Sequence, residues 1–406
     1  MKQFQVPPVY KSPLISRIKE QRKQEDRTKK DFSPTRLVLG PIEIYLARHF
    51  GFCYGVENAM EIAFSTVANN PGKNIFLLSE MIHNPQVNTD LSDLGVQFLQ
   101  DTHGKQLIPF DVLQPGDIVM IPAFGTTLEI EQLLTEKGIR LQPYNTTCPF
   151  VEKVWNRSAQ IAEKGYSIVV HGKPRHEETR ATFSHASRHT PTVVVNDIRE
   201  AAELAGYITG QKNPENFYRE FEGRYSAGFR CPDDLRKIGV VNQTTQLASD
   251  TQAIAEYLKQ VYINHFHLQP HEVAGHFADT RDTLCYATND NQTAVTGMLA
   301  TPADFALVIG GYNSSNSSHL VELCERKLIT YFIDGPDRLL GADTIEHRNW
   351  QTKELITIKN YLPPARPLKI LITSGASCPD AVVEKVIRKL AGFFNCEGIL
   401  DTLHFS

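Results

Sequence analysis

Short aliphatic runs alternate with amphipathic stretches along most of this chain. In the first such unit, the run 42–47 (IEIYLA) precedes a glycine-containing loop, and apolar residues at helical spacing follow over 56–67. The same order recurs within 74–95, 117–138 and 237–261. Strands that alternate with helices predict parallel sheets covered by helices. We therefore expect an α/β fold.

Two further strand-like runs close the chain, at 305–310 (FALVIG) and in 369–380 (KILITSGASCPD). The stretches 206–236 and 335–367 interrupt the alternation and are too long for simple turns, so we interpret them as insertions or long connections. The lengths of the units are compatible with three small α/β lobes of about 100 residues each. The predicted parts are an N-terminal extension (1–36), a first lobe (37–147), a second lobe with an insertion at 206–236 (148–275) and a third lobe (276–406).

The N-terminal extension is basic and has little apolar periodicity. Up to Thr35 it holds six Lys and three Arg against four acidic residues. We expect a mobile or peripheral segment with a partial helix around 14–27. Its acidic residues argue against an organelle transit peptide, which is normally poor in them.

The overall charge and hydrophobicity narrow the classes of partner. The net charge is −4 with 22% charged residues, which gives no general electrostatic case for binding nucleic acid or an anionic membrane. No apolar run approaches the roughly 18 to 20 residues of a membrane span, and no apolar secretory segment opens the chain. We expect a soluble, cytoplasmic protein with neither kind of partner.

The seven cysteines include no C-x-x-C pair and do not suggest a disulfide framework. Cys53, Cys148 and Cys285 each precede a helix-like run, where backbone N–H groups and the helix dipole favour a thiolate. One such cysteine alone is more often a small buried hydrophobic residue. Three in the same context indicate a site, either zinc completed by His or water, or an iron-sulfur cluster with one iron that lacks a protein ligand.

Polar residues follow nearly every predicted strand, where ligands bind in open α/β sheets. Glu178 in HEETRAT would be a proton donor beside the imidazole of His176, although a solvated helix start is an equal alternative for this pair. The other residues in such loops are His83, Thr244, Thr245, Asn313, Ser314, Ser315, Asn316 and Ser377.

The loop GGYNSSNSSHL, after the run 305–310, has the composition of a linker but the flanks of a strand-loop-helix unit. Successive Ser and Asn side chains with unpaired N–H groups at a helix start bind phosphate without Lys or Arg. Neither a Walker A sequence nor a G-x-G-x-x-G fingerprint is present, so nucleotide binding has no motif support. If the protein is a reductase, its electrons come from elsewhere.

Eight ordered motifs together resemble the 4-hydroxy-3-methylbut-2-enyl diphosphate reductase (LytB) family. The resemblance covers about 43–395. The N-terminal extension, the insertion at 206–236 and the sequence PAFGTT look like the cyanobacterial and plastid branch of this family. The motifs are GFCYGV, IHNP, TTCP, HEETRAT, NQTT, CYAT, NSSNS and SGASCPD.

This resemblance implies three α/β lobes around a central 4Fe-4S cluster held by Cys53, Cys148 and Cys285. It implies that the open iron takes the hydroxyl oxygen of the substrate, and that two electrons and two protons remove it as water. The products would be isopentenyl and dimethylallyl diphosphates, at the last step of the non-mevalonate isoprenoid pathway. Glu178 matches the residue that delivers protons, and Thr244 the one that assists at the hydroxyl.

The diphosphate positions carry over by motif, with one departure. Many bacterial members have a His where this chain has Phe124, so that contact is not carried over, and Cys378 stands where a smaller residue is commoner. The NQTT motif adds the hydroxyl of Thr245. The matching diphosphate positions are His83, His176, Ser314, Ser315, Asn316 and Ser377.

Two other functions compete with this one. A zinc hydrolase of a phosphorylated metabolite would use the same three cysteines with water as the fourth ligand. A non-catalytic module that senses phospho-sugars would use the 313–318 loop, but it leaves the placement of the cysteines unexplained. For a reductase we expect ferredoxin as electron donor, with the basic extension attracting its acidic surface.

Overall fold

The structure is a computed structural model of the chain and describes residues 4–28, 30–278, 283–364 and 366–403. It divides into two compact units. Unit 1 comprises Met1–Phe64, Ile82–Asp90 and Tyr286–Ser406, and unit 2 comprises Ser65–Met81 and Leu91–Cys285.

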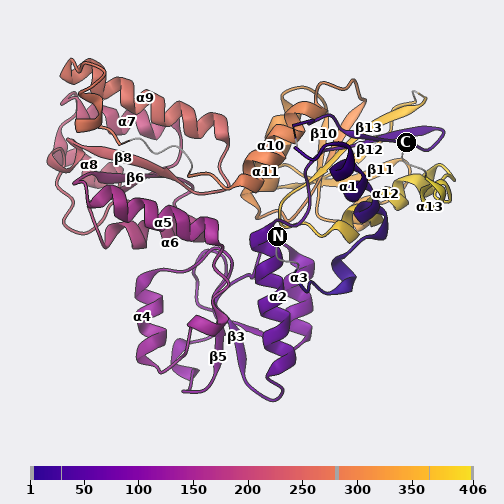
Figure 1. Cartoon of the computed structure of the whole chain (residues 1–406), viewed down its shortest axis with the longest axis horizontal. Helices are drawn as coiled ribbons and strands as arrows, with labels where there is room; N and C mark the ends of the chain where they lie inside the picture. The colour runs from indigo at the N-terminus through magenta and orange to yellow at the C-terminus, as the bar shows by residue number, and fades with distance from the viewer. Residues whose placement is uncertain (1–3, 29, 279–282, 365, 404–406) are drawn as a thin grey trace. The chain divides into compact units, whose positions relative to one another are not determined.

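The elements confirm the predicted alternation of strands and helices (Figure 1). The strands are β1 (Thr35–Val38), β2 (Ile42–Leu46), β3 (Ile75–Leu77), β4 (Gln97–Phe98), β5 (Ile118–Met120), β6 (Ser167–His171), β7 (Thr192–Val195), β8 (Ile238–Asn242), β9 (Phe305–Ile309), β10 (Thr330–Ile333), β11 (Thr344–Arg348), β12 (Leu355–Lys359) and β13 (Leu368–Ser374). The α-helices are α1 (Pro13–Glu25), α2 (Tyr54–Asn69), α3 (Pro85–Asp93), α4 (Leu128–Glu136), α5 (Pro149–Ala162), α6 (Glu177–Ser187), α7 (Ile198–Ile208), α8 (Pro214–Glu220), α9 (Ala248–Phe266), α10 (Tyr286–Met298), α11 (Ser315–Glu325), α12 (Asp380–Phe393) and α13 (Ile399–Thr402). Short 3-10 helices are η1 (Pro8–Tyr10), η2 (Phe110–Val112), η3 (Gln142–Tyr144), η4 (Asp233–Leu235), η5 (Val273–Gly275) and η6 (Pro336–Arg338).

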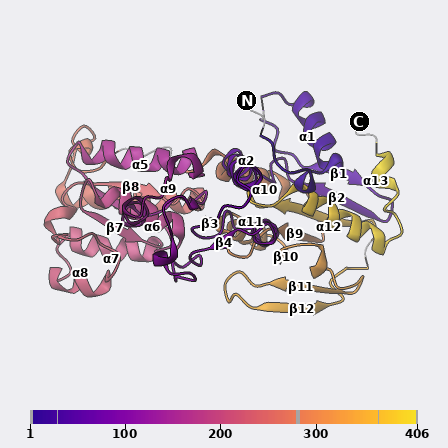
Figure 2. The same cartoon turned by 90° about the horizontal axis from the view of Figure 1, so that it is seen from below.

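Unit 1 is built on a five-stranded sheet in the order β1-β2-β13-β9-β10. Its pairings are parallel except for the β1–β2 hairpin. The sheet therefore joins strands from the two ends of the chain, β2 and β13. The predicted interruption at 335–367 contains the antiparallel ribbon β11–β12, which lies apart from this sheet (Figure 2).

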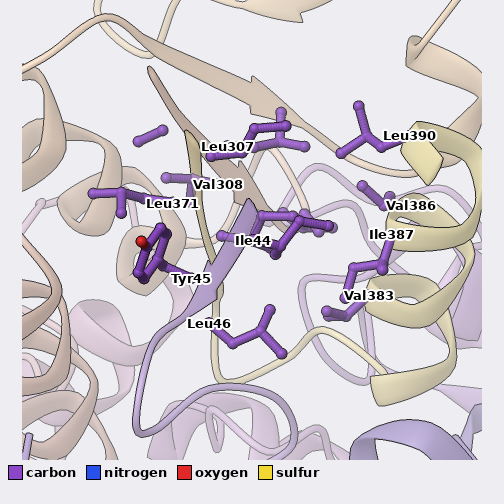
Figure 3. Packing of buried hydrophobic residues seen from close by; sticks show 14 of the residues in the cluster. Ile44, Tyr45, Leu46, Leu307, Val308, Leu371, Val383, Val386, Ile387 and Leu390 are labelled. Carbon is purple, nitrogen blue, oxygen red and sulfur yellow. The ribbon is translucent and has the colours of Figure 1, made fainter. Parts of the chain in front are cut away.

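One part of the core of unit 1 lies between this sheet and helix α12. Ile44 of β2 and Leu307 of β9 are fully buried, and the apolar side chains of α12 face them (Figure 3). Each such side chain stabilises the fold by about 1.5–3 kcal/mol on burial. The α12 residues in this contact, Val383, Val386, Ile387 and Leu390, recur at helical spacing.

Unit 2 holds two small parallel sheets, β4-β3-β5 and β7-β6-β8. In the second sheet, alternate residues face opposite sides, as the period of a strand requires. Val169 packs with residues of α7 and α9, whereas Val170 packs with residues of α5 and α6. These two pairs of helices cover opposite faces of the sheet (Figure 1). Parallel strands buried on both faces confirm the predicted fold class.

The insertion at 206–236 folds against this sheet rather than standing apart from it. Phe217 of α8 stacks on Phe221 and Phe229 with ring centroids 5.0 Å apart in both pairs. All three rings are buried in the same core as β7. The five-stranded sheet and the two three-stranded sheets are compatible with three lobes, but the predicted boundaries stay a prediction.

The N-terminal segment is a packed part of unit 1. The helix predicted around 14–27 is present as α1, capped by Ser12, whose hydroxyl accepts the N–H of Ile15 at 2.9 Å. Leu14, Ile15 and Ile18 are fully buried in the unit 1 core. The interpretation of this segment as mobile is therefore wrong, because its local pattern hides three core positions among many charges. Over the residues described, no helix is both long and apolar enough to cross a membrane.

Candidate functional site

In unit 1, the carboxyl ends of three parallel strands bring the predicted loops together. Strand β13 pairs with β9 through Ser374 and Ile309, and with β2 through Ile372 and Leu46. The loops that follow these strands leave the same edge of the sheet. They carry Ser377, the 313–316 residues and Cys53.

His83 joins these loops from a different part of the chain. The hydroxyl of Ser377 donates a hydrogen bond of 3.1 Å to the carbonyl oxygen of His83. A side chain at Gly311 would collide with that same carbonyl, so only glycine allows the approach. His83 and Ser377 are both buried, and three of the predicted binding loops therefore touch.

The predicted phosphate-binding residues Ser314, Ser315 and Asn316 lie at the start of α11, and we call them the cradle. All three are buried, unlike the residues of a solvated linker. Ser314 caps the helix by accepting the N–H of Ser317 at 3.2 Å, as the strand-loop-helix pattern predicted. The carboxamide oxygen of Asn316 accepts the N–H of Ala376 at 3.0 Å and an N–H of Asn291 at 3.4 Å. These bonds fix the orientation of the amide.

The amide nitrogen of Asn316 is buried and has no hydrogen-bond partner among the described residues. A buried donor without a partner costs free energy unless a ligand or water accepts its hydrogens. The first turn of α11, which also includes buried Ser315, therefore offers a fixed donor to an anionic group.

Ser317, which the sequence did not single out, is the packing centre of this cradle. Its side chain is fully buried, and a Cβ at either Gly310 or Gly375 would collide with its hydroxyl oxygen. The two glycines that end β9 and β13 therefore let α11 approach the sheet edge closely.

Cys53 lies directly before α2, in the same set of loops. Its N–H donates to the carbonyl oxygen of Ala376 at 3.2 Å, which ties it to the loop after β13. Burial raises the pKa of its thiol, and the N–H groups of Val56 and Gly55 partly offset that rise. Coordination to a metal would remove the proton of such a thiol.

In unit 2, strands β6 and β8 bring two further predicted loops together. His171 and Asn242, the last residues of these strands, are paired. The loop after β6 ends at His176, the N-cap of α6, whose Nδ1 accepts the N–H of Glu178 at 3.2 Å. This bond places the proton of a neutral ring on Nε2, which makes that nitrogen a donor.

Glu178 is almost fully buried, and its carboxylate accepts the N–H of Thr244, which is also buried. A carboxyl group in such a place is positioned by the backbone of the neighbouring loop. The alternative of a solvated helix start is therefore wrong for Glu178.

Gln243 connects these loops and was missed by the sequence analysis, although it lies in the NQTT motif. It is fully buried, and its side-chain oxygen accepts the hydroxyl of Thr179 at 3.0 Å. It also accepts the N–H of Lys173 at 3.2 Å, while its NH₂ group donates to Thr245 at 2.8 Å. Only its burial and these bonds reveal its role, since a lone Gln gives no signal in sequence.

Two of the predicted cysteines lie at the ends of this arrangement. The N–H of Cys148, the N-cap of α5, donates to the carbonyl oxygen of Ala123 at 2.9 Å. Phe124, which follows Ala123, packs its ring edge to face against the ring of His176, with the ring centroids 5.7 Å apart. The N–H of Cys285 donates to the carbonyl oxygen of Thr244 at 3.2 Å.

The three cysteines suit an iron-sulfur cluster in their chemistry. Each is a free thiol at the start of a helix, and three thiolates leave one iron of a 4Fe-4S cluster without a protein ligand. Cys53 belongs to unit 1, and Cys148 and Cys285 to unit 2. Within either unit, the described residues include no group of three His, Cys, Asp or Glu placed to hold a metal ion. The shared cluster therefore stays a prediction.

A groove of about 930 Å³ in unit 2 is lined mainly by α4 and α6. It contains none of the predicted site residues. We assign the chemistry to the strand ends, where buried donors converge, and not to this groove.

Comparison with known proteins agrees with the motifs. The sequence profile described as LytB protein matches residues 44–391. The 4-hydroxy-3-methylbut-2-enyl diphosphate reductase of a Picosynechococcus species is 38% identical over 94% of this chain and 89% of its own length. The reductase of the same name from a Synechococcus species is 40% identical over 87% of this chain and 86% of its own.

A solved structure shares the fold. The E-1-hydroxy-2-methyl-but-2-enyl-4-diphosphate reductase from Plasmodium falciparum superposes with a TM-score of 0.61 at 23% identity. The match covers 86% of this chain and 87% of that one.

Proposed function

The chain belongs to the LytB protein family and is an oxidoreductase, and we propose that it reduces 4-hydroxy-3-methylbut-2-enyl diphosphate to isopentenyl and dimethylallyl diphosphates. The carbon–oxygen bond of the allylic alcohol breaks, and the hydroxyl leaves as water after it takes one proton. Two electrons from an external donor and a second proton, which goes to an allylic carbon, complete the balance. This is the last step of the non-mevalonate isoprenoid pathway.

The observation that carries this proposal is the buried carboxyl group of Glu178, which accepts a hydrogen bond from the N–H of Thr244. The carbonyl oxygen of Thr244 in turn accepts the N–H of Cys285. The proposed proton donor is thus linked to a proposed metal ligand through the backbone of a single residue, Thr244. A zinc hydrolase also uses a carboxyl group beside its metal-bound water as a general base, so the metal content of the protein decides between the two functions.

A 4Fe-4S cluster held by Cys53, Cys148 and Cys285 would supply a Lewis acid for the hydroxyl oxygen and pass on single electrons. The protein supplies the rest. Glu178 holds a proton at a fixed place, because the N–H of Thr244 positions its carboxyl group. The hydroxyl of Thr244 orients the alcohol of the substrate.

The diphosphate would be held mainly by uncharged donors. In unit 1 these are the hydroxyls of Ser314, Ser315 and Ser377 and the amide of Asn316, together with His83. His176 contributes the N–H of its Nε2, and Thr245 its hydroxyl. Phe124 cannot donate a hydrogen bond, so the family contact at that position is absent.

The electron donor is proposed to be ferredoxin, because no dinucleotide-binding fingerprint is present. Exposed basic residues of the N-terminal segment would attract its acidic surface. Deletion of residues 1–36 would also remove core residues of unit 1, so single charges are the better target. Charge removal at exposed Arg17 and Lys23 should weaken ferredoxin-driven turnover more than dithionite-driven turnover.

Metal analysis of anaerobically purified protein tests the proposed function. We expect a brown protein with about four iron and four sulfide per chain and dithionite-driven formation of both products, separated by chromatography. A colourless protein with one zinc and no turnover would favour the hydrolase instead.

A further inference from the structure

The loop at 48–54, which contains Cys53, is contacted at alternate residues by the N-terminal segment 4–26. The first contact is at Arg48, which is buried although it carries a charge. Its guanidinium donates to the carbonyl oxygen of Arg22 at 3.2 Å and lies 4.0 Å from the carboxylate of Asp26. Arg48 thus fixes the start of the loop to the end of α1.

The second contact lies two residues further along the loop. The ammonium group of Lys19 lies 4.7 Å from the centre of the Phe50 ring and forms two hydrogen bonds with Asp380, at 2.8 and 2.9 Å. Gly51 has a φ of +83°, and a Cβ there would collide with Asp380 and lie 2.9 Å from Lys19. The ion pair therefore rests directly on the backbone of the loop.

Aromatic rings continue the series on both sides of Cys53. The ring of Tyr10 lies 6.1 Å from that of Phe52, and its hydroxyl donates to Asp90. The ring of Phe4 packs edge to face on Tyr54 at 4.8 Å. Phe4 and Tyr10 are both buried.

These contacts have a regular order. Alternate loop residues, from 48 to 54, meet segment residues of falling number, from 22 to 4, so the two stretches run in opposite directions. The contact pairs are Arg48 with Arg22, Phe50 with Lys19, Phe52 with Tyr10 and Tyr54 with Phe4.

We propose that residues 4–26 are a brace that positions Cys53, with the Lys19–Asp380 ion pair as its fixed point. The importance of Cys53 rests on the proposed function. Ordering a loop between a strand and a helix costs roughly 1–2 kcal/mol per residue, and a metal ligand must be held to about 0.5 Å. The brace supplies four such contacts to the loop, at alternate residues from 48 to 54.

The test compares Lys19→Met with Lys23→Met, a matched control on the same helix. Lys23 has a 71% exposed side chain, and its ammonium group lies 3.5 Å from the carboxylate of exposed Glu20. In the full-length metal-free protein, Lys19→Met should speed hydrogen–deuterium exchange of the 48–54 peptide about threefold to tenfold. The control should match the wild type, and Lys19→Arg, which keeps the charge, should restore slow exchange.

A second readout links the brace to the ligand. In reconstituted protein, Lys19→Met should lose iron to a chelator several times faster than Lys23→Met and change the electron paramagnetic resonance spectrum of the reduced cluster. Asp380→Asn should reproduce both effects, which separates the ion pair from the lysine stem.

The possible outcomes distinguish the proposed brace from the proposed function. Equal exchange in Lys19→Met and Lys23→Met would overturn the brace, and so would faster exchange with unchanged iron loss. If the wild type binds no iron, the proposed function fails, whereas the exchange experiment still decides whether these contacts hold the loop.

Discussion

The two units hold their candidate residues in different ways. In unit 1 the first turn of α11 is positioned by close packing around Gly310 and Gly375, and its groups are uncharged hydroxyls and an amide. In unit 2 the backbone N–H of Glu178 positions the ring of His176, and the N–H of Thr244 positions the carboxyl group of Glu178. Under the proposed function, unit 1 supplies most of the groups that bind the diphosphate, and unit 2 adds His176 and Thr245 to this binding and supplies the proton from Glu178.

This division also explains why unit 1 needs no lysine or arginine in the cradle. Hydroxyls, amides and helix N–H groups bind phosphate oxygens by geometry. A change of side-chain volume should therefore disturb the site residues of unit 1 most. A change in the proton carried by Glu178 should disturb those of unit 2 most.

The largest effect is expected for Cys148, a proposed metal ligand in unit 2. Cys148→Ser should abolish turnover and lower the iron content, because a hydroxyl is a poor ligand for iron in such clusters. Cys231→Ser is the matched control, since Cys231 lies in the same unit outside the site. A full, reducible cluster in Cys148→Ser would exclude Cys148 as a ligand.

The next effect is expected in the cradle of unit 1. Asn316→Asp keeps the oxygen that accepts the N–H of Ala376 but replaces the buried donor with an acceptor. KM should rise about a hundredfold, because a lost hydrogen bond to a charged group costs roughly 1.5–3 kcal/mol, while kcat changes little. Ser318→Ala, on the same helix, should leave both constants near wild type; a fall in kcat alone in Asn316→Asp would break the division between binding and chemistry.

A smaller effect tests the role of space in unit 1. Gly375→Ala should lower the free energy of unfolding by about 1–3 kcal/mol through overpacking, measured by denaturant titration. Adding Ser317→Ala removes the hydroxyl oxygen that the new Cβ would strike and should recover part of the loss. No recovery in the double variant would argue against this packing.

The smallest effect concerns pH and unit 2. The ring of His185 stacks on Trp155 at 3.6 Å, and burial lowers the pKa of His185 to about 4 from the ordinary 6.5. Since the unfolded chain takes up this proton first, stability is fully present above pH 6.5 and falls as the pH drops towards 4. His185→Phe should remove at most about 1.4 kcal/mol per pH unit from the acid slope of unfolding. An unchanged acid slope in His185→Phe would contradict the lowered pKa of His185.

The local pattern of the chain predicted the elements and the loops well. Apolar runs and helical spacing are local properties, and the buried strands β6 and β9 follow from them directly. The polar residues at 313–316 and at 176–178 were placed at helix starts for the same reason. These features need no knowledge of distant contacts.

The parts that were missed depend on contacts between distant residues. The pairing of β2 with β13 joins segments more than 300 residues apart, and no local pattern encodes it. Gln243 accepts hydrogen bonds from Lys173 and Thr179, 70 and 64 residues away, and only the folded loops bring these groups together. The three core residues of α1 were hidden by charges that face solvent, so the segment was misread as mobile.

The central claim is that Glu178 supplies the proton and the cradle only binds, and a single variant tests it directly. Steady-state kinetics of Glu178→Gln, with dithionite as the electron source, should show kcat reduced about 10²–10⁴-fold, with KM within about threefold of wild type and the iron content unchanged. A kcat close to wild type in an iron-loaded Glu178→Gln protein would contradict the account.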